Sequence, residues 1–197
     1  MVMPAAPPAR SQEVVMEWLI VVGILAVVAV AFVVAYNGLV RLRNAVQNAW
    51  AQIDVQLKRR YDLIPNLVET VKGYASHERE TLDSVTQARA AAMAAEGVGE
   101  QARAESQLSQ ALFNLRAVAE AYPDLKANQN FAQLQSELTS TEDRIAFSRQ
   151  GYNDAVRTYD DRRQSIPTNI VAGLANFTSY EYFEADPDSR TPVKVEF

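Results

Sequence analysis

The chain has no cysteine, one histidine and only seven glycines in 197 residues. The absence of cysteine excludes disulfides, a lipid-attachment cysteine and thiolate metal sites. The single histidine, His77, excludes a paired-histidine metal site, and Thr81 stands where a zinc-protease signature requires its second histidine. Gly97-Val98-Gly99 lacks the further glycines of a phosphate-binding loop. We therefore expect no catalytic residues, no metal and no cofactor.

The chain also lacks a large excess of charge of either sign. The chain has 19 basic and 24 acidic residues, which give a net charge of −5. Nucleic-acid binding requires a concentrated basic face, so no nucleic-acid partner is expected, and no small-molecule substrate is predicted. Helix-favouring residues dominate the composition while glycine is rare, which predicts an all-α fold.

What the chain does contain is an uncharged apolar run from Trp18 to Tyr36. As a helix it would reach about 29 Å, close to the hydrocarbon thickness of a bilayer. The leader, residues 1–17, is not basic, and the run is longer than the core of a cleaved signal, so we favour a retained anchor. The interpretation is a disordered leader at 1–17 and one transmembrane helix at 18–36, with the lipid bilayer as partner.

Four residues are candidates for the membrane interface. Trp18 and Tyr36 bracket the run, as aromatic rings do at membrane surfaces, and Arg41 and Arg43 follow it directly. Because only Arg10 precedes the run, the positive-inside tendency places the leader outside and the remainder of the chain in the cytoplasm.

Residues 37–177 read as an elongated antiparallel bundle of long helices, similar to a four-helix bundle. A first apolar stripe runs from Leu39 to Ile64, where Pro65 predicts an end or a kink and can open the next helix. That next helix reaches about residue 96, a third begins near Glu100 and stops at Pro123, and a short one covers 167–174 with Ser165 as a possible cap. The tail, 178–197, is expected to be irregular.

The fourth long helix has the most regular pattern, a coiled-coil-like seam of three- and four-residue steps. Its two polar members, Thr141 and Ser148, are expected near the edge of the bundle. The seam consists of Phe131, Leu134, Leu138, Thr141, Ile145, Ser148, Tyr152, Val156 and Tyr159.

The densest polar cluster contains Asp54, Lys58, Arg59, Arg60 and Asp62, and it lies just ahead of Pro65-Asn66. The favoured interpretation is a solvated face with pairs between Lys58 and the aspartates four residues away. The alternative is a buried polar lock where the proline folds one helix against the next. Contact of the arginines with lipid headgroups is disfavoured, because they lie about 36 Å beyond Tyr36 on a straight helix.

Two blocks of residues after the anchor form a distinctive pattern. The first contains Tyr36-Asn37, Arg43, Trp50, Ile53-Asp54, Gln56-Leu57, Arg59-Arg60, Asp62 to Val68, Lys72-Gly73-Tyr74 and His77-Glu78, and the second runs from Thr141 to Tyr159. In these blocks the chain resembles the LemA family of bacterial membrane proteins. The resemblance implies an anchor carrying a cytoplasmic helical bundle at the bacterial inner membrane. It brings no established enzymatic activity, cofactor or substrate, and some relatives act in building the magnetosome membrane.

The leading hypothesis is a non-enzymatic scaffold that self-assembles or binds other membrane proteins through helix packing, in membrane organisation or envelope stress. The alternative is a membrane-associated enzyme with an interfacial site, supported only by Asp54, Arg59, Arg60 and Asp62, or else a protease regulator.

Overall fold

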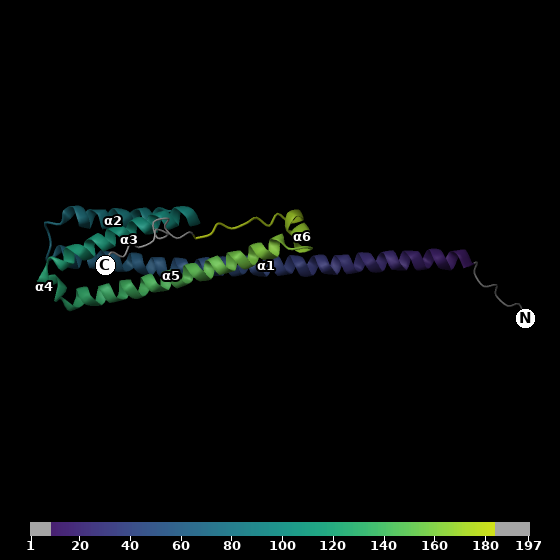
Figure 1. Ribbon diagram of the computed structural model, residues 1–197, viewed down its shortest axis with the longest axis horizontal. Helices are drawn as coiled ribbons and strands as arrows, with labels where there is room; N and C mark the ends of the chain where they lie inside the picture. The colour runs from purple at the N-terminus through teal and green to yellow at the C-terminus, as the bar shows by residue number, and fades with distance from the viewer. Residues whose placement is uncertain (1–8, 184–197) are drawn as a thin grey trace, which may run out of the picture. The chain divides into compact units, whose positions relative to one another are not determined.

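The computed structural model describes residues 9–183, with side chains from residue 14 onward. All regular structure within these residues is helical, which confirms the predicted all-α class. The helices are α1 (Ala9–Lys72), α2 (Arg79–Ala94), α3 (Val98–Glu120), α4 (Pro123–Lys126), α5 (Gln129–Gln164) and α6 (Thr168–Leu174) (Figure 1).

The chain forms two compact units, and α1 and α5 each contribute to both. Within the described residues, the first unit comprises residues 9–43 and 159–178, and the second comprises residues 44–158 and 179–183.

In the second unit, α1 and α5 run antiparallel. The ring of Trp50 meets that of Tyr152 at 5.4 Å between centroids, and further along α1 the Arg59 guanidinium lies 3.6 Å from the Glu137 carboxylate. α2 packs against α3. The core is built from helix faces with three- and four-residue periodicity, as amphipathic helices require. It includes Val46, Ile53, Leu57, Ile64, Leu67, Val71, Val85, Leu108, Leu115, Leu125, Leu138, Ile145, Tyr152 and Val156.

Of the two outcomes predicted at Pro65, an end or a kink, the end is wrong, because α1 continues through Pro65 to Lys72. A proline inside a helix leaves the carbonyl four residues earlier without its usual N–H donor. That carbonyl belongs to Tyr61, and the side chain of Arg89 on α2 donates its Nε–H to it at 2.7 Å. A neighbouring helix therefore supplies the hydrogen bond that the proline removes. The next helix begins only at Arg79, after a turn that contains Gly73.

We expect Arg89→Ala to lower the free energy of unfolding by about 1–3 kcal/mol, because it leaves the Tyr61 carbonyl without a donor. Pro65→Ala restores a backbone N–H at the right place, so the same Arg89→Ala change should cost clearly less in a Pro65→Ala background. The measurement is a double-mutant cycle by chemical denaturation. Equal costs in the two backgrounds would show that Arg89 does not compensate for the proline.

The seam of α5 packs inward, and one expectation about it is wrong. Thr141 does not lie at the edge of the bundle but is 1% exposed. Its hydroxyl donates to the Glu137 carbonyl at 2.8 Å, which satisfies the polar group inside the core. Ser148 is half-buried. Since the seam is used within the chain, any assembly between chains requires other residues.

The first unit contains the apolar run and α6. Along α1, the large apolar side chains from Val14 to Val34 are exposed. Within the described residues, one helix is long and apolar enough to cross a membrane, judged by length and composition. α6 buries Thr168, Val171 and Ala172. The expected cap at Ser165 is wrong, because Pro167 holds the N-cap position and the Ser165 hydroxyl donates to the Asp161 carbonyl at 2.6 Å.

The described part of the predicted tail has no helix or strand, but it is held against α5. The backbone N–H of Phe183 donates to Asn153 Oδ1 at 2.8 Å, and Asn153 Nδ2 donates to the Phe183 carbonyl at 3.0 Å. The Tyr152 hydroxyl donates to the Glu181 carbonyl at 2.8 Å. Residues 184–197 of the predicted tail and residues 1–8 of the predicted leader lie outside the described residues. The prediction of a disordered leader is wrong for residues 9–17, because they form the first turns of α1.

Candidate functional site

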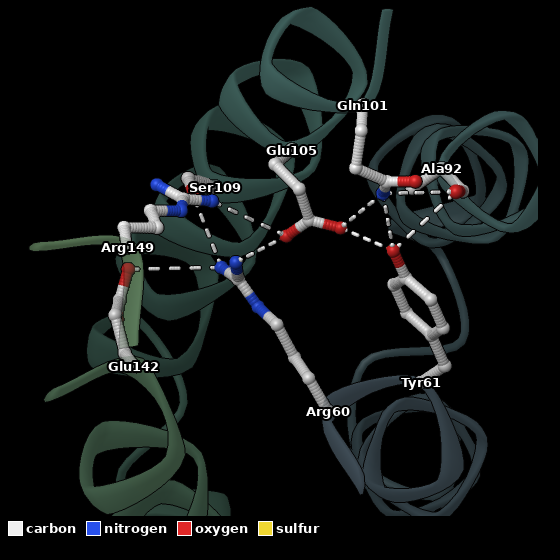
Figure 2. A network of polar contacts seen from close by, with 8 residues as sticks. All are labelled: Arg60, Tyr61, Ala92, Gln101, Glu105, Ser109, Glu142 and Arg149. Carbon is white, nitrogen blue, oxygen red and sulfur yellow. Dashed lines mark hydrogen bonds and ion pairs between the residues drawn. The ribbon is translucent and has the colours of Figure 1, made fainter. Parts of the chain in front are cut away.

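A buried polar cluster joins four helices of the second unit, and we call it the four-helix network (Figure 2). α1, α2, α3 and α5 all contribute to it, so it ties together segments that are far apart in sequence. Its members are Arg60, Tyr61, Gln101, Glu105, Ser109, Glu142 and Arg149, together with the backbone carbonyl of Ala92.

Glu105 of α3 lies at the centre of the four-helix network. The residue is 1% exposed, and its two carboxylate oxygens face different partners. Oε2 accepts from Arg60 Nη1 at 2.9 Å and lies 4.0 Å from Arg149 Nη2. Oε1 accepts a hydrogen bond from the Tyr61 hydroxyl. A buried carboxylate is tolerated only when it is paired and hydrogen-bonded, and Glu105 meets both conditions.

The Tyr61 side of the four-helix network connects α1 to α2 and α3. Gln101 Nε2 donates to the Tyr61 hydroxyl at 2.9 Å and to the Ala92 carbonyl at 3.2 Å. Burial raises the pKa of Tyr61, and so does the hydrogen bond that its hydroxyl donates to Glu105. The phenol therefore keeps its proton at neutral pH and acts as a donor to the carboxylate.

The arginine side connects α1 to α3 and α5. Arg60 Nη2 donates to Ser109 Oγ at 2.9 Å and lies 3.6 Å from the half-exposed Glu142 carboxylate. The Arg149 guanidinium stacks over the Phe183 ring at 4.3 Å from its centroid. Burial lowers the pKa of Arg149, against the attraction of Glu105. Two arginines facing two glutamates leave the cluster balanced in charge.

A cavity of about 400 Å³ opens beside this cluster, between α1, α3 and α5. Arg60, Ser109, Arg116 and Glu142 line it together with apolar groups, among them the exposed ring of Phe113. Its polar lining offers cations, hydroxyls and one carboxylate. Within residues 9–183, no group of three or more histidine, cysteine, aspartate or glutamate side chains is placed to hold a metal ion.

The structure separates the residues of the sequence-predicted polar cluster. Arg60 points into the core, whereas Arg59 is exposed and reaches Glu137 on α5. Asp54 and Asp62 are both exposed, and partial burial raises the pKa of Asp54. In the part of the chain that the structure describes, Lys58 forms no ion pair with either aspartate. The favoured interpretation, a solvated face, therefore holds for Asp54, Arg59 and Asp62, but the ion pairs with Lys58 that it included do not form among the described residues. The alternative, a buried polar lock, holds for Arg60.

The other two members of the motif, Pro65 and Asn66, are exposed on α1. The Asn66 carbonyl accepts from Thr70 Oγ1 at 2.7 Å, within the same helix. The lock forms without any break in the helix at Pro65, contrary to the folding-back that the alternative assumed.

The four predicted interface residues all lie on α1 in the first unit. Trp18 is 66% exposed and Arg41 is also exposed. The Tyr36 ring meets the Phe177 ring edge-on at 5.6 Å between centroids, and the Arg43 guanidinium lies 5.5 Å from the same ring centroid. Two of the four therefore also pack against the segment that follows α6.

Sequence reasoning missed Glu105, Gln101 and Ser109, and it treated Tyr61 only as part of an apolar stripe. A signal was present, because Arg60 falls between Leu57 and Ile64 at helical spacing, on the buried stripe of α1. Glu105 likewise precedes Leu108 by three residues on the buried face of α3. Opposite charges in phase with two buried stripes indicate a pair across the core.

Comparisons with known proteins place the chain among relatives of one family. The model of the LemA family matches residues 49–197. Protein LemA of Metamycoplasma hominis is 30% identical over 80% of this chain and 72% of its own length. Magnetosome protein MamQ 1 of Paramagnetospirillum magneticum is 27% identical over 89% of this chain and 75% of its own length. Magnetosome protein MamQ of Magnetospirillum gryphiswaldense is 23% identical over 94% and 79% of the two chains.

Membership of this family and the one apolar N-terminal helix found in residues 9–183 together fit a membrane protein. The family model covers most of the chain and includes every residue of the four-helix network. The chain belongs to the LemA family.

Proposed function

We propose that this protein is a single-pass membrane protein whose helical bundle acts as a self-assembling scaffold in membrane organisation or envelope stress. α1 would cross the bacterial inner membrane once, with the N-terminus outside and the bundle in the cytoplasm. Two of the three relatives described above are magnetosome proteins by name, which supports a role at a membrane for this chain as well.

The observation that carries the proposal is the contrast between inward-facing polar groups and outward-facing apolar groups in the second unit. The charges of the four-helix network are tied to one another, whereas Val55 and Phe147 are 64% and 79% exposed. Val55 lies on α1 between Trp50 and Arg59, and Phe147 lies on α5 between their contacts Tyr152 and Glu137. The two side chains therefore occupy neighbouring levels of one antiparallel helix pair.

We call the exposed side chains of Val55 and Phe147, one on each of these helices, the α1–α5 surface, and we assign a second copy of the chain as its occupant. Anchors in one bilayer hold copies in the same plane, which raises their effective concentration and allows a small apolar contact to suffice. A two-fold contact would place the same patch on both partners. The enzyme alternative needs Asp54, Arg59, Arg60 and Asp62 to converge, and only Arg60 reaches the cavity.

We expect the full chain in mild detergent to form assemblies larger than one chain, with a mass that falls on dilution. Phe147→Asp should shift the dissociation midpoint to at least tenfold higher concentration, because it places a charge in the apolar contact. Ala146→Asp adds the same charge in the same exposed turn and serves as the matched control. Analytical ultracentrifugation measures both variants.

A single-chain mass at every concentration would overturn the self-assembly proposal. An equal effect of Phe147→Asp and Ala146→Asp would overturn the assignment of the α1–α5 surface and leave only a general sensitivity to charge.

A further inference from the structure

α6 and Ile166, which precedes it, expose a line of large apolar side chains that are not packed into the core. Ile166, Ile170 and Leu174 are 84%, 62% and 73% exposed. They recur every four residues, which places Ile170 and Leu174 on one side of α6 with Ile166 just ahead of its first turn. The buried residues of α6 lie on the other side. We call these three residues the α6 stripe.

The α6 stripe lies near the part of α1 where the apolar run ends. Phe177, three residues beyond α6, is buried, and its ring contacts both Tyr36 and Arg43 of α1. Tyr36 closes the uncharged run, and Arg43 is the second arginine after it. A helix rises about 10 Å between these two positions. All these residues belong to one compact unit, so the segment that ends α6 lies beside the stretch of α1 that leaves the apolar run.

The charges around this stretch are mainly basic. Arg41 and Arg43 of α1 and Arg162 at the end of α5 are exposed. Asp160 accepts from Arg163 Nε at 2.9 Å and is mostly buried, which leaves Asp161 as the exposed carboxylate. Exposed arginines next to an apolar surface are the combination that anionic lipid headgroups attract.

We propose that α6 is an interfacial helix that lies on the membrane, with the α6 stripe inserted between the headgroups and acyl chains of the leaflet from which α1 emerges. Interfacial helices bury their apolar side about 5–10 Å deep in this region. This depth is similar to the rise of about 10 Å along α1 from Tyr36 to Arg43. The same bilayer that would surround the exposed apolar run of α1 would also cover the α6 stripe. The inference rests on the part of the proposed function that places α1 across a bilayer.

The absence of native cysteine makes the proposal directly measurable. Single cysteines at Ile170 or Leu174 of the full chain are labelled with a bimane fluorophore and reconstituted into vesicles of phosphatidylcholine and phosphatidylglycerol. Brominated lipids report contact with acyl chains, and iodide reports contact with water. Asn169→Cys, exposed on the flank of the same helix, is the matched control, and Val27→Cys marks the middle of the apolar run.

We expect bromolipid quenching at Ile170→Cys and Leu174→Cys to exceed that at Asn169→Cys by about threefold or more, with the opposite order for iodide. Circular dichroism of each variant confirms that the helices are retained. Strong bromolipid quenching at Val27→Cys supports the membrane span on which the inference rests.

Three results would overturn the proposal. If Val27→Cys is quenched by bromolipid while Ile170→Cys matches Asn169→Cys and is open to iodide, α6 faces water and the proposed function stands. If Ile170→Cys and Leu174→Cys are shielded from both quenchers, another protein or a second copy covers the stripe. If Val27→Cys is not quenched by bromolipid, α1 does not span the bilayer and the proposed function fails with the inference.

Discussion

Glu105→Ala should lower the free energy of unfolding by about 3–5 kcal/mol, because it leaves buried Arg60 without its carboxylate partner. The change also removes the acceptor of the Tyr61 hydroxyl and the nearest carboxylate to Arg149. Ser109 and the half-exposed Glu142 remain near Arg60, but neither replaces a buried charge at 2.9 Å. Chemical denaturation of the full chain in detergent, followed by circular dichroism, measures the loss.

Two further variants separate a lost charge pair from a general packing defect. Glu142→Gln removes the partly exposed carboxylate and is expected to cost less than about 1 kcal/mol, as surface pairs do. Arg60→Met combined with Glu105→Leu removes both charges with little change in volume, and the double variant should be far more stable than Glu105→Ala alone. A cost for Glu105→Ala no greater than that for Glu142→Gln would show that the four-helix network does not hold the bundle together.

The fold follows closely from helical periodicity, and the failure at Pro65 shows where such reasoning stops. Apolar positions such as Val46, Ile53 and Leu57 predicted the buried face of α1 because periodicity states which side of a helix avoids water. The rule that proline ends a helix is local. Arg89 lies 28 positions from Tyr61 in sequence, so its donation to the Tyr61 carbonyl depends on the packing of α2 against α1.

The candidate site was predictable only in part, for the same reason. Arg60 was singled out within a polar cluster, but its partner Glu105 lies 45 positions away. Helical spacing predicts that each residue lies on the buried face of its own helix, but it does not predict that these two faces pack against each other. Phe183 was likewise assigned to an irregular tail, since no periodic pattern marks residues 178–183. Its position depends on distant residues: the side chain of Asn153 pairs with both backbone groups of Phe183, and the Phe183 ring lies against Trp50 and Arg149.

Tyr152 carries the second large effect. The residue is 1% exposed, its ring packs edge-on against Trp50, and its hydroxyl holds the Glu181 carbonyl. Burial raises its pKa to about 12, so the hydroxyl keeps its proton and remains a donor at neutral pH. Tyr152→Ala should therefore lower the free energy of unfolding by about 3–5 kcal/mol, the range for truncating a buried aromatic side chain.

The matched control is Phe113→Ala, because Phe113 is also an aromatic residue in the middle of a helix but is 65% exposed. It should change the free energy of unfolding by no more than about 0.5 kcal/mol. Limited proteolysis adds a local readout, since loss of the Glu181 contact should increase cleavage at residues 179–183 in Tyr152→Ala and leave it unchanged in Phe113→Ala. Similar stability losses in both variants, with no new cleavage, would mean that the contact between α5 and residues 179–183 is not part of the folded core.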